Sequence, residues 1–471
     1  MDLTPFIPDS ATPWNRRRVL HLLRRTGFGG DAARVDEFLA LTPSDAVDRI
    51  VDHCLATPAF ARPVWADIGR PAPGSSQEVL IAYTAQRAGY VAEFRRDLTG
   101  TILRNGLHGR LTLFWHSHFA TEIFEYGNMP QYAWRYIRVI QSHLAGDFKR
   151  MVYDMGLTPA MLIYLNGNLN RRTSPNENYA RELLELYTLG EGNGYTQGDI
   201  TELSKALTGY TTNDQTLQVA FSTTHHDNWF KTIFGVRENF NYPMAVDHIF
   251  AARPQQVARH ICRKLHAHFV HPDAPVEVIE AMAAVFLANQ FRVEPVLRAL
   301  FKSRHFFEEA HIGALVKSPY ELFGGLMATL ATSDIYTTTD YATILAGSVE
   351  MGFNILDPPD VGGWPGHRTW LDTSRLPIRW SRAETFLGRF SGSIMAFART
   401  MPDPNDPFAL AADLAEFLTP MPVGPDERQT LGLTLLSGTP AYEWSIHATG
   451  ATNRVLAYIR HLLQLPEFQL T

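Results

Sequence analysis

SPNENYARELLELYTLG, residues 174–190, is the stretch that most clearly predicts the local structure of this chain. Ser174 can cap a helix, the proline after it suits the first helical position, and Glu177 completes a capping box. Leucines then recur at helical spacing until Gly190, a residue type that commonly ends helices. The stretch therefore predicts one amphipathic helix over residues 178–189.

The same helical spacing extends through most of the chain. Apolar residues three and four positions apart predict helices over about 14–26, 31–55, 77–107, 110–126, 130–155, 196–208, 245–270, 274–288, 292–304, 318–332 and 340–351. The last hundred residues predict four more. Between residues 210 and 240, a loosely alternating segment among turn residues predicts one or two short strands, forming a hairpin between the helices.

We therefore expect a mainly α fold, with a large multi-helix globular domain over residues 10–395. A small β-hairpin-like insertion is expected at about 210–240. Residues 396–471 are expected to form a helical C-terminal extension packed on this domain. A hydrophobic content of 45% in 471 residues is enough to form a large core.

The composition argues against several classes of protein. A formal net charge of -6 offers no basic face for nucleic acid. No stretch is apolar for long enough to span a membrane. The first residues show no signal peptide, so a cytoplasmic location is expected unless a leader has been removed. Cys54 and Cys262 suit neither a disulfide framework nor a thiolate zinc site. The expected partner is a small-molecule or peptide substrate, and the oligomeric state stays open.

Two histidines and two glutamates are candidate metal ligands. His116 and His118 lie in an aromatic-rich segment, and neutral imidazoles are the commonest metal ligands. Positions two apart on a helix point in different directions, however, and hydrogen-bonded core histidines are the simpler interpretation. Glu182 and Glu185 lie one turn apart on a leucine-rich helix. Buried carboxylates there need either a cation or a basic partner, for which Arg181 is available.

His226, Asp227 and Lys231 follow the predicted strands. An imidazole, a carboxylate and an amine that meet in a cleft can act as ligands or as an acid–base set. The all-helical metal-dependent phosphohydrolases also have a His–Asp pair, but theirs lies on a helix. Here the pair lies among turns and strands, so that analogy is rejected.

Other motifs carry less weight. Four histidines lie near the end of one predicted helix: His260, His266, His268 and His271. Histidines there can simply complement the helix dipole. The chain has no Gly-x-Ser-x-Gly elbow, Walker loop or His-Glu-x-x-His motif. Its one Glu-x-x-His motif runs from Glu308 to His311, whereas a ferritin-like di-iron bundle needs two.

Residues 357–368 form a loop rich in proline and glycine, whose shape is restricted by the fixed φ of its prolines. Such a loop can present side chains rigidly to a cavity, although Trp364 can also simply close the end of the helical core. We predict that the loop forms one wall of the cleft that contains His118 and Glu182. The residues expected to line this substrate cleft are Asn178, Arg181, Asp360, Trp364 and His367.

In their order along the chain, these segments resemble a widespread bacterial family, domain of unknown function 1800. The matching segments are HLLRRTGFG (21–29), FWHSHF (114–119), PAML (159–162), NENYARELLEL (176–186), YT (195–196) with Asp199, ALTG (206–209), HD (226–227) with Lys231 and Gly235, KL (264–265) and PPDVGGW (358–364). The resemblance covers about residues 15 to 390.

The resemblance implies little chemistry, because the family has no established general activity. Members are often secreted and encoded beside proteins that resemble sulfatases or phosphatases, whereas this chain shows no leader. The family pattern includes the glutamate-bearing helix and the segment from His226 to Lys231, which favours a role for both. Tyr187 stands where a histidine is often expected, so no ligand role is carried over to that position.

The leading expectation is a metal-dependent enzyme, with an oxidoreductase favoured over a hydrolase. Iron, manganese, zinc and copper all suit mixed imidazole and carboxylate ligands, and helical bundles with such ligands often carry out oxygen chemistry. The expected site gathers His116, His118, Glu182, Glu185, His226 and Asp227. One alternative is a non-catalytic helical module that binds a peptide or a glycan. Another is a hydrolase, either metal-dependent or an acid–base enzyme that uses His226, Asp227 and Lys231.

Overall fold

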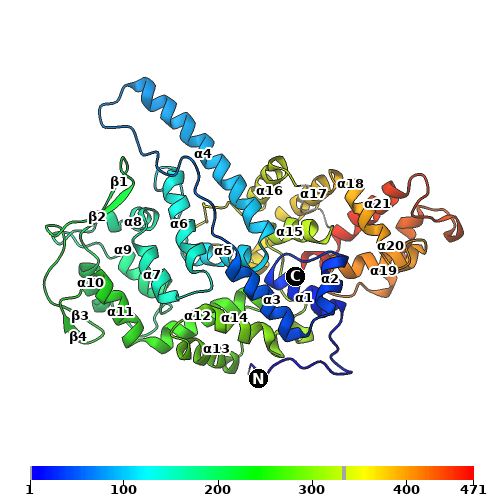
Figure 1. Ribbon diagram of the computed structural model, residues 1–471, viewed down its shortest axis with the longest axis horizontal. Helices are drawn as coiled ribbons and strands as arrows, with labels where there is room; N and C mark the ends of the chain where they lie inside the picture. Colours follow the sequence, from blue (N-terminus) through cyan, green and yellow to red (C-terminus); the bar gives the residue numbers. More distant parts are fainter. Residues whose placement is uncertain (1–2, 331–335) are drawn as a thin grey trace.

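A computed structural model of the chain describes residues 3–330 and 336–471. The chain is 59% helical, with 21 α-helices and two small antiparallel sheets among the described residues. Figure 1 shows helices along the whole length of the molecule, with the strands confined to one end. The expected mainly α fold with a small strand insertion is thereby confirmed.

The helices before the strands are α1 (Arg16–Thr26), α2 (Ala32–Leu39), α3 (Pro43–Ala56), α4 (Gln77–Arg104), α5 (Gly106–His118), α6 (Pro130–His143), α7 (Phe148–Gly156), α8 (Pro159–Tyr164), α9 (Asn178–Glu185) and α10 (Gln197–Ala206). The strands are β1 (Tyr210–Asn213), β2 (Gln218–Phe221), β3 (Lys231–Ile233) and β4 (Val236–Glu238). The next helices are α11 (Tyr242–Ala252), α12 (Pro254–Phe269), α13 (Val276–Ala288), α14 (Val293–Lys302), α15 (Pro319–Thr329) and α16 (Thr338–Glu350). The last are α17 (Arg375–Gly388), α18 (Ser391–Arg399), α19 (Pro407–Leu418), α20 (Pro425–Leu436) and α21 (Ala451–Gln464). Short 3-10 helices are η1 (Gly167–Leu169), η2 (His305–Phe307), η3 (Glu309–His311), η5 (His367–Trp370), η6 (Ala441–Glu443) and η7 (Pro466–Gln469).

Prolines set several helix boundaries that the apolar spacing alone missed. The predicted helix over 31–55 is two helices, α2 and α3, and the one over 245–270 is also two, α11 and α12. Pro43 and Pro254 begin the second helix of each pair, because proline suits a first turn but disfavours helical geometry in the residue before it. The predicted helix over 318–332 ends at Thr329, and residues 331–332 lie outside the described part of the chain.

The predicted capping box at Ser174 is wrong. The helix α9 begins at Asn178, and its cap residue Glu177 makes no side-chain capping bond. The Glu177 carboxylate instead accepts hydrogen bonds from Thr201 Oγ1 at 2.7 Å and Gln197 Nε2 at 2.8 Å. A contact with the neighbouring helix α10 has replaced the local cap.

The strand insertion contains more strands than expected. β1 pairs with β2 and β3 pairs with β4, so two antiparallel hairpins stand where one was predicted. Phe234 and Gly235, between β3 and β4, both have positive φ values, 49° and 81°. Two such residues are typical of the tight turn that joins neighbouring antiparallel strands.

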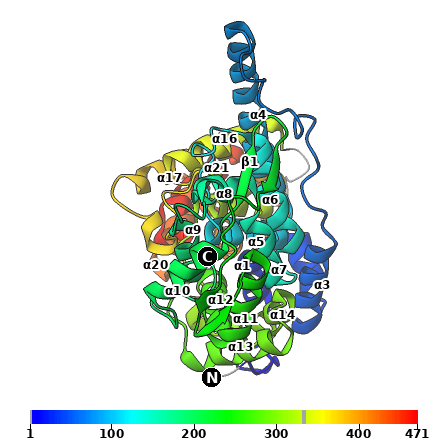
Figure 2. The same cartoon turned by 90° about the vertical axis from the view of Figure 1, so that its left-hand side faces the viewer.

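Helix α5 is the centre of the fold. It is buried along most of its length and packs against α3, α4 and α6. It ends at His118, eight residues earlier than predicted, because the chain turns toward Leu356, whose carbonyl accepts from Ile123 N at 2.8 Å. Only the second half of α4 is buried against the other helices. Its first half projects from the rest of the molecule (Figures 1 and 2).

The C-terminal helices pack on the rest of the molecule. In Figure 1 the helices α17 to α21 form the right-hand end, where α21 contacts α17 and α18, and α19 contacts α15. The last hundred residues contain five α-helices rather than four. Lys317 Nζ donates to Phe468 O at 2.6 Å, and Arg379 Nε donates to Gln469 Oε1 at 2.9 Å. Among the described residues, no helix is both long and apolar enough to cross a membrane.

Candidate functional site

A cavity of about 310 Å³ lies between α5, α12, the start of α15 and the loop that precedes α17. Its polar lining includes Arg110, Ser117, His118, Lys264, His268, Ser318, Glu321 and His367. Its apolar lining includes Leu113, Phe114, Leu315, Val316, Phe353, Trp364 and Trp370. A pocket of this size, mostly apolar with a few polar groups, suits a small molecule.

The proline- and glycine-rich loop forms one wall of this cavity. Gly363 has φ 82°, and a Cβ atom there would collide with the carbonyl oxygen of Ser117. Glycine therefore lets the loop approach the end of α5 closely. Trp364 N donates to Ser117 Oγ at 3.1 Å, and the Trp364 ring packs on Phe353 with centroids 4.5 Å apart.

Lys264 and His118 form the central polar pair of the cavity. Lys264 Nζ donates to His118 Nδ1 at 3.0 Å, and His118 Nε2 donates to Tyr187 O at 3.3 Å. Burial lowers the pKa of Lys264 to about 8. Burial, followed by the charge of Lys264, holds the pKa of His118 well below its usual range, so this ring is neutral and accepts.

A buried ion pair also lines the cavity. Arg110 pairs with Glu321, and their side chains are 3% and 10% exposed. Burial alone would raise the pKa of Glu321, but Arg110 and the backbone of Ser318 outweigh it and hold the value at about 2. The negative charge of Glu321 therefore balances the positive charge of Arg110, not that of Lys264. The hydrogen-bond partner of Lys264 in the described residues is the neutral imidazole of His118.

His268 adds a further imidazole to the wall. Burial lowers its pKa to about 3, and its Nε2 has no hydrogen-bond partner among the described residues. This nitrogen can accept from, or donate to, a bound molecule, depending on the tautomer.

The four predicted metal ligands do not meet as one set. His116 Nδ1 lies 2.7 Å from Tyr136 Oη, and His116 Nε2 accepts from Leu356 N at 3.0 Å. Both nitrogens of His116 thus have hydrogen-bond partners in the core. Both nitrogens of His118 are occupied as well, by Lys264 and Tyr187.

One of the two candidate carboxylates of α9, Glu185, is paired within its own helix. The Arg181 guanidinium lies 3.4 Å from Glu185 Oε1 and 3.3 Å from Glu177 Oε2. Arg181, the basic partner that the sequence suggested, therefore does pair with Glu185. Glu182 is half-buried, and burial, then the charge of Glu185, raises its pKa. Neither Glu182 nor the other two predicted cleft residues of this helix, Asn178 and Arg181, line the cavity.

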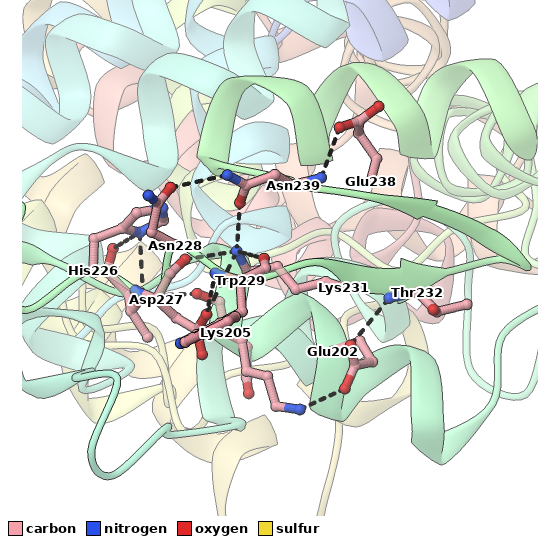
Figure 3. A network of polar contacts seen from close by, with 12 residues as sticks. Glu202, Lys205, His226, Asp227, Asn228, Trp229, Lys231, Thr232, Glu238 and Asn239 are labelled. Atoms are coloured by element: carbon pink, nitrogen blue, oxygen red, sulfur yellow. Dashed lines mark hydrogen bonds and ion pairs between the residues drawn. The ribbon is translucent and has the colours of Figure 1, made fainter.

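His226, Asp227 and Lys231 do lie together, but the amine is fully hydrogen-bonded, to two backbone carbonyls and to Asn239 Oδ1 at 3.3 Å (Figure 3). Lys231 Nζ donates to Asp227 O at 2.6 Å and to Trp229 O at 2.8 Å. The Asp227 carboxylate is 3.8 Å away and accepts from Trp229 N at 2.9 Å. His226 Nδ1 lies 3.0 Å from Thr208 O. These contacts hold the loop before β3 against Thr208, just after α10, and leave the amine no free position.

The predicted loop residues divide into two groups. Trp364 and His367 line the same cavity as His118, whereas Asp360 is exposed and accepts from Gly362 N at 2.7 Å within its own turn. The loop and His118 thus share one cleft, and Glu182 lies outside it.

The sequence interpretation overlooked Lys264, Arg110 and Glu321 as site residues. One signal was present. His260, Lys264 and His268 follow one another at four-residue spacing, which places these three polar groups on one face of the helix. No such signal was present for the ion pair between Arg110 and Glu321, because these residues are 211 positions apart in the chain.

Comparison with known proteins gives one match. A family described as "Protein of unknown function (DUF1800)" matches residues 21–470, which extends beyond residue 390 and through the C-terminal helices. No curated protein matches the chain, and no solved structure does. The match covers nearly the whole chain, and we conclude that the chain belongs to the DUF1800 family of proteins of unknown function.

Proposed function

We propose that this protein is an enzyme that acts on a small molecule with a carbonyl group and an apolar body, and that Lys264 is its nucleophile. One observation carries the proposal. An amine lies in the wall of a largely apolar cavity, and its partner is a neutral imidazole rather than a carboxylate. Burial without a counter-charge favours the neutral, nucleophilic form of a lysine.

The proposed step is imine formation. The lone pair of neutral Nζ attacks the carbonyl carbon, and the π electrons of the carbonyl move to its oxygen. Nζ gives up two protons in the course of the reaction, the oxygen leaves as water, and a carbon–nitrogen double bond remains. His118 positions the amine through the hydrogen bond to its Nδ1, and its own orientation is fixed by Tyr187 O.

The remaining groups of the cavity would bind the substrate. Phe114, Trp364 and Trp370 would contact an apolar or aromatic body. The unpartnered Nε2 of His268 would hydrogen-bond a polar substituent.

Reductive trapping tests this proposal. Benzaldehyde with sodium borohydride at pH 8 adds a benzyl group to any lysine that forms an imine, and peptide mapping locates it. We expect Lys264 to be labelled at least about tenfold faster than Lys149, a surface lysine that pairs with Asp247. A Lys149→Arg variant should keep the fast labelling and a Lys264→Arg variant should lose it. Equal labelling of the two lysines in the wild type would contradict the proposal.

A second candidate is a non-catalytic binding module, as considered from the sequence. The ion pair between Glu185 and Arg181 favours it, because this carboxylate then has a structural role. The cavity volume suits a small molecule better than an extended peptide or glycan. A metal-dependent oxidoreductase that uses His116, His118, Glu182 and Glu185 stays a prediction from the sequence, and their hydrogen bonds and ion pairs do not favour it.

A further inference from the structure

His305, Glu308 and His311 form a cluster separate from the lysine cavity. They lie on two consecutive 3-10 turns, η2 and η3, directly after α14. One potential ligand atom of each lies within 4.8 Å of the other two. Within residues 3–330 and 336–471, this is the one group of three or more histidine, cysteine or acidic side chains that satisfies the condition.

The hydrogen bonds around His305 determine which of its nitrogens carries a lone pair. His266 Nδ1 lies 2.7 Å from His271 O, and it must donate because a carbonyl only accepts. In the neutral His266 ring, Nε2 is then an acceptor. His305 Nε2, at 2.9 Å, donates to it. The lone pair of His305 is therefore on Nδ1.

This lone pair has no partner. His305 is 2% exposed, and its Nδ1 is buried without a hydrogen bond in the described part of the chain. It lies 3.6 Å from Glu308 Oε2, which is also an acceptor. Two acceptors that face each other repel unless a proton or a cation lies between them, and the buried His305 Nδ1 cannot be compensated by a hydrogen bond to bulk water.

His311 presents a second imidazole to the same place. Its Nδ1 lies 3.9 Å from Glu308 Oε2 and donates to His305 O at 2.7 Å. The lone pair of His311 is then on Nε2, and the ring must turn to present it to an ion. The His305 and His311 rings lie with centroids 4.4 Å apart, and the His311 side chain is 12% exposed. Glu308 is 34% exposed, which gives the cluster an opening to solvent.

We propose that His305, Glu308 and His311 bind a divalent transition-metal ion of the zinc type. Two imidazoles and one carboxylate are a ligand set that proteins use for zinc, with water in the fourth position. Bonds of about 2.0–2.1 Å in a tetrahedral site place neighbouring ligand atoms about 3.3 Å apart. The 3.6 Å between His305 Nδ1 and Glu308 Oε2 is close to that value. His266 orients His305 by accepting from its other nitrogen, as partners of ligating histidines usually do.

The ion would connect two parts of the fold. It would join the turns after α14 to α12 through His266, and α12 also carries Lys264 and His268. It would therefore stabilise the helix that forms one wall of the cavity. The proposal does not depend on the chemistry of Lys264, because none of the three ligands lines the cavity.

The full chain is stripped with a chelator, dialysed and titrated with zinc chloride, and bound zinc is measured by mass spectrometry of the metal. We expect one tightly bound zinc per chain and a rise in Tm of about 3–5 °C at saturation. Cobalt in place of zinc should give the visible absorption of a tetrahedral site. Glu308→Gln keeps the shape of the side chain and should lower the affinity at least about tenfold.

His271→Asn is the matched control, because this side chain is close to the cluster but is not a ligand, and it should bind zinc as the wild type does. His311→Asn provides a second ligand variant, with circular dichroism as the check on folding. A wild type that binds no zinc would overturn the proposal. Equal binding by the wild type, Glu308→Gln and His271→Asn would also overturn it, since it would indicate adventitious binding by surface histidines.

Discussion

The pKa of Lys264 determines how its reactivity depends on pH. A value of about 8 leaves about a tenth of the amine neutral at pH 7, against less than about a thousandth for a lysine with a pKa near 10.4. Reactivity should rise as the pH rises, because deprotonation produces the nucleophile. We expect the benzaldehyde labelling rate of Lys264 to increase tenfold per pH unit below 8 and to level off above it.

The comparison lysine for this pH profile is Lys149 on the surface. The labelling rate of a lysine with an ordinary pKa rises until about pH 10. A Lys264 profile that follows that of Lys149 would show that the amine is not activated by its surroundings.

His116 has a structural role that a substitution can measure. His116→Phe would leave Leu356 N and Tyr136 Oη without their partner in the core. We expect a loss of about 2–4 kcal/mol in the free energy of unfolding, measured with urea. The loss should be the same with and without a chelator, and His447→Phe, at an exposed position, should cost little. A loss that disappears in the chelator would instead indicate a metal at His116.

The histidines show why residue roles were only partly predictable. The sequence made His116 and His118 candidate ligands, with core histidines as the simpler interpretation, and gave little weight to His266 and His268. Their hydrogen-bond partners come from positions far away in the chain, such as residue 356 for His116 and residue 305 for His266. Spacing along a helix shows which side chains share a face but not which atoms lie opposite that face.

At the scale of elements, the wall formed by residues 357–368 depends on Gly363. Gly363→Ala would combine a positive φ with a collision against Ser117 O, so the loop would have to move away from α5. We expect a loss of about 3 kcal/mol in stability and slower labelling of Lys264. Gly438→Ala has nearly the same φ, 83°, but open space around it, and should cost only about 1–2 kcal/mol. Similar effects of both variants on labelling would contradict this role of the loop.

The β3–β4 hairpin depends on Lys231. Lys231→Met would remove the donor that holds the carbonyls of Asp227 and Trp229, and we expect a loss of about 2 kcal/mol in stability. Hydrogen exchange of residues 227–239 should be about tenfold faster. Labelling of Lys264 should not change, because Lys231 does not line the cavity. Lys205→Met, which removes a partly exposed ion pair with Glu202, is the control and should leave exchange in this segment nearly unchanged.

At the scale of the whole molecule, the C-terminal segment is part of the core. Gln469→Leu would remove the acceptor of Arg379 Nε, and both terminal nitrogens of this buried guanidinium have no hydrogen-bond partner among the described residues. We expect the free energy of unfolding to fall by about 2–3 kcal/mol, and thermal unfolding to remain a single cooperative transition at a lower Tm. Gln464→Leu, on the exposed side of α21, should have little effect. Two separate transitions in the wild type would show instead that residues 396–471 fold independently.

The sequence by itself determined the helical character of this protein, the place of the strand insertion and the family. These properties depend on residues near one another in the chain, such as the apolar spacing along α12 and the prolines at helix starts. Only the tertiary structure decided which polar side chains meet. It brought Lys264 to His118 and Arg110 to Glu321, and it separated Glu182 from the cavity. The physical reason is that a buried polar group must find a partner in space, and the partners in these two pairs are 146 and 211 residues apart in the chain.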